Sequence, residues 1–110
     1  AENYDQSTIS HLMSVLDEEN TDYRRAAVKT LGAIGFDAVP PLVQALTSSD
    51  NVTVRGSAAK ALAQVAINYP DEPFPAEGLQ GLKTALNDPN PVVHIATVMA
   101  LGEIGSPVVD

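Results

Sequence analysis

The same pattern of apolar residues occurs three times in this chain of 110 residues. The copies span residues 9–35, 39–66 and 79–105, and each holds two leucines that lie 15 or 16 residues apart. A unit of this length cannot bury an apolar face alone, whereas stacked units bury a continuous core, so the regular repeat predicts a solenoid. The leucine pairs are Leu16 with Leu31, Leu46 with Leu62, and Leu86 with Leu101.

Within each copy, apolar residues recur at intervals of three and four, which is the spacing of one face of a helix. The first copy opens with Ile9, Leu12, Met13 and Leu16 in this register, and a second helical pattern follows a polar turn. We therefore predict an all-α, right-handed solenoid of three HEAT-like helical hairpins that forms a single domain over residues 1–110. In the second helices we expect these residues to be buried: Tyr23, Ala27, Val28, Leu31 and Ile34; Val54, Ala58, Ala59, Leu62 and Val65; and Val93, Thr97, Val98, Leu101 and Ile104.

The helix ends follow the same repeat. Asp50, Asn51 and Asn90 are residue types that cap the N-termini of helices, and they stand where second helices are expected to begin. Gly35 and Gly105 stand where second helices are expected to end, in the left-handed conformation that glycine tolerates.

An insertion at residues 67–78 separates the second copy from the third. Its three prolines predict a stiff, extended segment. Tyr69 and Phe74 lie in it, and inserted loops often carry function. The alternative is that the two aromatic side chains pin the loop to the core, and we favour this interpretation.

The end of the third copy affects the expected organisation. The residues after Gly105, SPVVD, resemble the opening of the second copy, so a further copy is expected to begin there. A third hairpin without a polar cap would leave apolar surface open, which predicts either a piece of a longer array or pairing with another copy or subunit. The start at Ala1, without Met, indicates processing or excision.

Charge and composition narrow the classes of partner. The net charge is −8, and the field of such a chain repels the phosphates of nucleic acids and anionic membrane surfaces. No stretch approaches the roughly 20 apolar residues of a membrane span, and no signal peptide opens the sequence. There is no cysteine, which fits a reducing compartment and excludes disulfides and thiolate zinc sites. We expect a protein partner, no nucleic acid, no membrane span and a cytoplasmic location.

Neither a metal site nor a catalytic centre is expected. The only histidines are His11 and His94, and neither belongs to a motif with metal-ligand spacing such as H-E-x-x-H. Ser57 and Ser106 lack the G-x-S-x-G context of an esterase nucleophile.

A loose consensus links three strings: DYRRAAVKTLGAIGFDAVPPLVQAL, NVTVRGSAAKALAQVA and NPVVHIATVMALGEIG. It consists of a polar turn, a hydrophobe followed by Arg, a pair of Ala, then Leu-Gly and Ile-Gly. The consensus resembles the HEAT-like repeat of the phycobilisome (bilin) lyase type over nearly the whole chain. The resemblance implies that members attach or detach linear tetrapyrroles on phycobiliproteins, assist phycobilisome turnover or act as adaptors. It is specific for fold and weak for function, because such repeats serve many roles.

The arginine of this consensus is Arg24 in the first copy and Arg55 in the second, whereas the third has His94. One interpretation is contact with an anion or a propionate. We favour a structural ladder to carboxylates or carbonyls of adjacent turns, such as Asp17 or Asp50, because the arginines follow the repeat as scaffolding does.

Projection at 100° per residue from Leu31 identifies an exposed surface on the second helices. This surface carries Lys and Arg side chains in the first two copies, although the chain as a whole is acidic. In the third copy the same surface carries apolar side chains. An exposed apolar strip marks a contact surface, although a missing segment or a symmetry mate is the alternative cover. We predict partner binding by Arg25, Lys29, Lys60, Val92, Ile95 and Met99.

The leading functional hypothesis is a non-catalytic scaffold for protein interactions in phycobilisome biology, without a cofactor. Its partner would be a phycobiliprotein or a second HEAT-like subunit, and self-association is a further option. The alternative is a subunit of a bilin lyase or isomerase that cradles a linear tetrapyrrole such as phycocyanobilin, with Lys and Arg holding its propionates.

Overall fold

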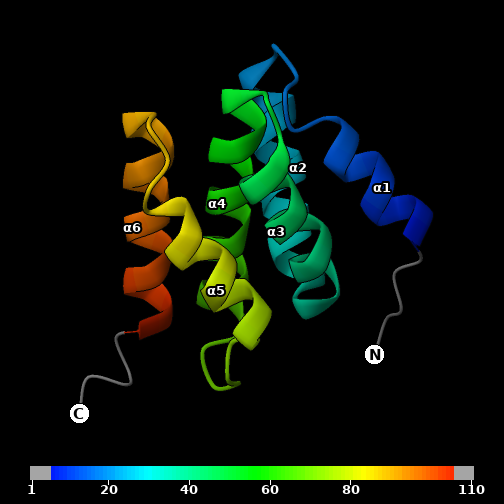
Figure 1. Ribbon diagram of the computed structural model, residues 1–110. Coiled ribbons are helices and arrows are strands. Elements are labelled where there is room, and N and C mark those ends of the chain that lie inside the picture. The colour runs from blue at the N-terminus through cyan, green and yellow to red at the C-terminus, as the bar shows by residue number, and fades with distance from the viewer. Residues whose placement is uncertain (1–5, 106–110) are drawn as a thin grey trace.

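The computed structural model describes residues 6–105, which form two layers of α-helices (Figure 1). Consecutive helices pair as hairpins, and the three hairpins stack side by side, so the predicted all-α solenoid is confirmed. One layer holds α2, α4 and α6, and the other holds α1, α3 and α5. The helices are α1 (Gln6–Ser14), α2 (Thr21–Ile34), α3 (Val39–Ser48), α4 (Val52–Asn68), α5 (Ala76–Ala85) and α6 (Pro91–Gly105), with a 3-10 turn, η1 (Phe36–Ala38), before α3.

An asparagine precedes each second helix and caps its N-terminus. Asn20 accepts a hydrogen bond at Oδ1 from a backbone amide of α2 at 3.0 Å. Asn51 and Asn90 do the same for α4 and α6, at 2.8 and 2.9 Å. These bonds satisfy amides that have no partner inside a helix. Asp50, predicted as a third candidate, is exposed and precedes the capping residue.

Only one of the two predicted glycine ends has the expected backbone. Gly35 follows α2 with a φ of 90°, a conformation that side-chain-bearing residues rarely adopt. Gly105 is instead the last residue of α6 and has no positive φ.

The core lies between the two layers. Leu16, Leu31, Leu46 and Leu62 are at most 1% exposed, as the repeat predicts. Of the residues expected in the core, Val28, Val54, Leu101 and Ile104 are half-buried and pack against it, whereas two are exposed: Tyr23 at 48% and Val98 at 47%. Both lie on the terminal helices of their layer, where only one side is covered by a neighbouring helix.

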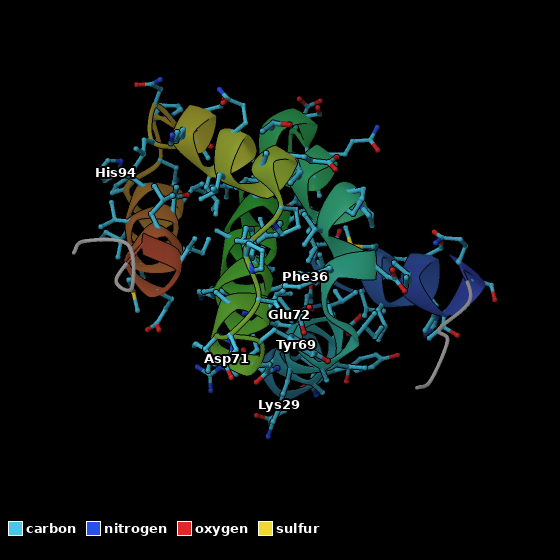
Figure 2. All side chains as sticks on the ribbon, turned by 90° about the horizontal axis from the view of Figure 1, so that it is seen from below. Lys29, Phe36, Tyr69, Asp71, Glu72 and His94 are labelled. Carbon is cyan, nitrogen blue, oxygen red and sulfur yellow. The ribbon has the colours of Figure 1, made fainter. Side chains whose placement is uncertain are left out.

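The inserted segment is shorter as a loop than predicted, because α4 continues to Asn68 and α5 begins at Ala76. Its aromatic residues pin it to the first hairpin. The Tyr69 hydroxyl donates to the backbone oxygen of Ala33 at 2.5 Å, and the Tyr69 and Phe74 rings pack on Phe36 with centroids 5.7 and 6.1 Å away. Figure 2, which views the stack from below, shows Phe36 and Tyr69 close together, and both are half-buried.

Two contacts hold the second helices together. We call the contact of α2 with α4 the first seam and the contact of α4 with α6 the second seam. In the first seam, a Cβ atom on Gly32 would lie 2.3 Å from Cγ of Gln64. In the second seam, a Cβ atom on Gly56 would lie 3.8 Å from a methyl group of Val92, which is an ordinary contact.

No helix in the described part of the chain is by itself long and apolar enough to cross a membrane. By length and composition alone, α2 and the stretch from Phe36 to Ser48, which meet at a bend of 115°, are together long and apolar enough to do so.

Candidate functional site

The first seam opens at the surface into a hollow with basic walls. Its volume is about 290 Å³. It lies between the exposed sides of α2 and α4, and Figure 2 shows Lys29 of α2 pointing away from the body of the molecule. We call this the basic hollow; it is lined by Thr21, Arg24, Arg25, Val28, Lys29, Ser57, Lys60 and Gln64.

The second seam opens into a hollow with apolar walls and a volume of about 480 Å³. Small residues of α4 and α6 form its floor, and large exposed side chains form its rim. Val92, Ile95 and Met99 are 58%, 58% and 64% exposed. We call this the apolar hollow; it is lined by Lys60, Ala63, Val92, Ile95, Ala96 and Met99.

Lys60 joins the two hollows, because it lines both and also lines a smaller hollow of about 240 Å³ between them. The structure thus brings together all six residues predicted for partner binding. Arg25, Lys29 and Lys60 surround the basic hollow, and Val92, Ile95 and Met99 surround the apolar one. Their role in binding stays a prediction.

Positive charge is concentrated at the basic hollow. The chain has six Lys and Arg residues, and four of them line this hollow. Arg24 is occupied by a backbone oxygen, but among residues 6–105 no ion pair or hydrogen bond engages Arg25, Lys29 or Lys60. Three unpaired cations on a chain of net charge −8 form a local site for negative charge.

Sequence reasoning missed the small residues that make the apolar hollow possible. Ala63 and Ala96 face each other across the second seam, and larger side chains there would fill the space. A signal was present, since Ala63 stands in the repeat where the first copy has Gly32.

Arg24 and Arg55 lie in the first turns of α2 and α4. The Arg24 guanidinium donates to the backbone oxygen of Glu18 at 2.5 Å, and the Arg55 guanidinium donates to that of Ser49 at 3.0 Å. The acceptors are therefore backbone oxygens of the preceding turn, and not Asp17 or Asp50. Any contact of these arginines with a ligand stays a prediction.

Arg55 makes an additional bond that Arg24 lacks. Its Nε lies 2.7 Å from Oδ2 of Asp88, in the turn of the next hairpin. The Arg55 hydrogen bond lowers the pKa of Asp88 most, a backbone hydrogen bond from Asn90 lowers it further, and desolvation opposes both. Asp88 therefore stays ionised and ties the second hairpin to the third.

His94 takes the place of the arginine in the third hairpin. Its Nδ1 lies 2.9 Å from the backbone oxygen of Leu86, so it contacts its own turn as the arginines do. Figure 2 shows it at the outer side of α6. Ser57 is buried, and its hydroxyl donates to the backbone oxygen of Leu16 at 3.1 Å. Among residues 6–105, no three His, Cys, Asp or Glu side chains gather as metal ligands would.

Known relatives place this architecture in a family. The family described as HEAT repeats matches residues 9–76. The chain is 71% identical over 109 residues to a protein from Pseudanabaena tenuis (strain PCC 7409) named uncharacterized phycocyanin operon protein Z. It is 40% identical over 102 residues to bilin biosynthesis protein CpeZ from Synechococcus sp. (strain WH8020), and 38% identical over 60 residues to bilin biosynthesis protein MpeU from the same strain.

These matches cover 99%, 93% and 54% of the chain, but only 54%, 55% and 20% of the three relatives. The chain thus spans about half the length of the first two. The match to the HEAT-repeat family covers more than half of the chain and coincides with stacked hairpins of the structure. The chain therefore belongs to the HEAT-repeat proteins, the repeat type that its sequence predicted.

Proposed function

We propose that the chain serves bilin biosynthesis as a non-catalytic scaffold that docks a protein partner on the exposed surface of α2, α4 and α6. The single observation that carries the proposal is the junction of the basic hollow with the apolar hollow at Lys60. The names of the relatives supply the context of phycocyanin and bilin biosynthesis. The partner is a phycobiliprotein subunit, and the location is the cytoplasm.

The chemistry of the surface fits such a partner. Unpaired Arg25, Lys29 and Lys60 attract carboxylates, which speeds association and fixes orientation. Met99 and Ile95 offer apolar area beside them, and methionine adapts its shape to the partner. A protein surface with an acidic group next to apolar side chains satisfies both hollows at once.

The test is direct binding of the chain to a purified phycobiliprotein subunit without its pigment, measured by calorimetry or biolayer interferometry. Lys60→Glu is expected to weaken binding at least tenfold, which corresponds to about 1.4 kcal/mol. Ile95→Asp is expected to weaken it similarly, because it places a charge in the apolar hollow.

Lys83→Glu is the matched control, because Lys83 is an exposed lysine of α5 in the other layer and lines neither hollow. It changes the net charge as Lys60→Glu does and is expected to leave binding unchanged. Equal weakening by the two charge reversals, or none by either, would contradict docking at this surface.

The second candidate function is the cradling of a linear tetrapyrrole, as part of a bilin lyase or isomerase. The sizes of the hollows favour it, since about 480 Å³ of apolar space beside three cations is in the range of small-molecule sites. Here the cations would hold the propionates and the apolar hollow the ring system. A shift in the absorbance of free phycocyanobilin on adding the chain, lost in Met99→Asp, would select this function.

A further inference from the structure

Arg24 and Arg55 occupy the same place in the repeat but differ in what their guanidinium groups bond. Each stands four residues after the asparagine that caps its helix, and each donates through Nη1 to the backbone oxygen two residues before that asparagine. The remaining edge of Arg55 is closed, since its Nε and Nη2 bond the two carboxylate oxygens of Asp88 at 2.7 and 3.3 Å. The same edge of Arg24 has no acceptor among residues 6–105.

This difference comes from one residue in the turn before α4. Asp88 stands two residues before the capping Asn90, and Ser49 stands two residues before the capping Asn51. Each of these two side chains accepts a hydrogen bond from the backbone amide of its asparagine, so they are placed alike. Ser49 supplies a hydroxyl where Asp88 supplies a carboxylate. The first seam therefore has the arginine of an ion pair without the acid.

The surface beside Arg24 is open and carries no acidic side chain. Arg24 is half-buried, and with Thr53 and Lys60 it lines the hollow of about 240 Å³ that lies between the basic and the apolar hollow. We call this the Arg24 hollow. Within residues 6–105, no Asp or Glu lines it or the basic hollow, whereas two carboxylates line the hollow beside Arg55. A half-buried guanidinium without a counter-ion favours a carboxylate, because its planar donors match both oxygens of that group.

On the basis of the docking function proposed for this surface, we propose that the Arg24 hollow is a carboxylate site, which an Asp or Glu side chain of the docked protein occupies. This carboxylate takes the part that Asp88 has in the second seam, and its oxygens accept from Nε and Nη2 of Arg24. Lys60 and Thr53 add an ammonium and a hydroxyl to the same hollow. Since Lys60 also lines the apolar hollow, the anchored acid places apolar side chains of the partner there.

The size of the Arg24 hollow favours a protein side chain over a free pigment. Its volume of about 240 Å³ is below the range of about 300 to 1,000 Å³ that small-molecule sites occupy. A single acidic side chain needs no more space than this. It also reaches the site from a backbone that the fold of the partner already holds in place, so little conformational freedom is lost on binding.

Ser49→Asp tests the site, because it supplies the missing carboxylate from within the chain and competes with that of the partner. Binding to the purified phycobiliprotein subunit is expected to weaken about tenfold, while Tm should not fall, because the substitution adds an ion pair to the fold. In an Arg24→Gln background, Ser49→Asp should weaken binding no further. Ser48→Asp is the matched control, since it adds the same charge at an exposed residue that lines neither the Arg24 hollow nor the basic hollow. It should change binding by less than about twofold.

A probe that is neither protein nor pigment separates this proposal from the docking function. In an NMR titration, glutarate is expected to shift the Nε–Hε resonance of Arg24 and to leave that of Arg55 in place, because Asp88 already occupies it. Equal shifts of the two resonances, or a shift of Arg24 that persists in Ser49→Asp, would overturn the carboxylate site without touching the docking function. A wild type that binds no phycobiliprotein subunit but keeps its glutarate response would refute docking and support the site.

The identity of the occupant has its own test. Unchanged affinity of Ser49→Asp for the phycobiliprotein subunit would overturn the proposal that an acidic side chain of this partner binds Arg24. If Ser49→Asp at the same time lost the binding of free phycocyanobilin, the occupant would be a propionate of the pigment. Loss of affinity for the subunit alone supports the proposal as stated.

Discussion

The first and second seams join helices of one layer by different means. In the first seam, α2 approaches α4 so closely that a Cβ atom on Gly32 would overlap the Gln64 side chain, and the Arg24 side chain bonds a backbone oxygen. In the second seam, Gly56 has ordinary space around it, and Arg55 adds an ion pair with Asp88. The repeat thus fixes where the helices lie, while close packing stabilises one seam and charge stabilises the other.

Of the changes that separate the two seams, loss of the Arg55–Asp88 ion pair should lower the free energy of unfolding most. Asp88→Ala removes the bonds to Arg55 and the acceptor of the Asn90 amide, and is expected to lower the free energy of unfolding by about 2 to 3 kcal/mol. Ser49→Ala is the matched control, since Ser49 accepts from the Asn51 amide in the same way but has no ion pair. It should cost only about 1 kcal/mol. Equal losses in urea denaturation would show that the ion pair contributes nothing.

The close approach at the first seam comes next. Gly32→Ala is expected to lower the free energy of unfolding by about 1 to 2 kcal/mol, because the overlap with Gln64 outweighs the helix preference of alanine. Gly56→Ala, at the second seam, should be neutral or stabilising by up to about 1 kcal/mol, because its methyl group would make ordinary contact with Val92. Chemical denaturation of the two variants checks this, and a loss at Gly56 as large as at Gly32 would mean that both seams are equally tight.

The two seams show which features of the structure the sequence alone could predict and which it could not. The leucine spacing was enough to predict helical hairpins, because periodic burial leaves a periodic signal. Projection around the helix brought Lys60 and Met99 to one surface for the same reason. The Arg55–Asp88 pair escaped prediction, because it joins turns of different hairpins and depends on how closely these stack. The exposure of Val98 was not predicted, because the corresponding position of the repeat is buried in the second copy. Val98 is exposed because it lies on the last helix of its layer.

The missing ion pair of the first seam can be added. By the repeat, Ser49 stands before α4 where Asp88 stands before α6, and both accept from the amide two residues later. Ser49→Asp is therefore expected to pair with Arg24 and to raise the free energy of unfolding by about 0.5 to 1 kcal/mol. The gain should vanish in an Arg24→Ala background, and Ser48→Asp should give none. A gain that survives without Arg24 would come from another source, such as the helix dipole.

Acid should weaken the second seam alone. Because its partners hold the pKa of Asp88 below the ordinary value of 3.8, the folded state binds its proton less readily than the unfolded state. The resulting stability is present above the ordinary value and is lost as pH falls through the lowered one. The difference in free energy of unfolding between the wild type and Asp88→Asn should therefore be constant from pH 7 to about 5 and shrink toward pH 3. The corresponding difference for Ser49→Ala should stay level, because a hydroxyl does not titrate there. A difference for Asp88→Asn that stays level as well would mean that the carboxylate gains nothing from Arg55, and that the two seams differ in packing only.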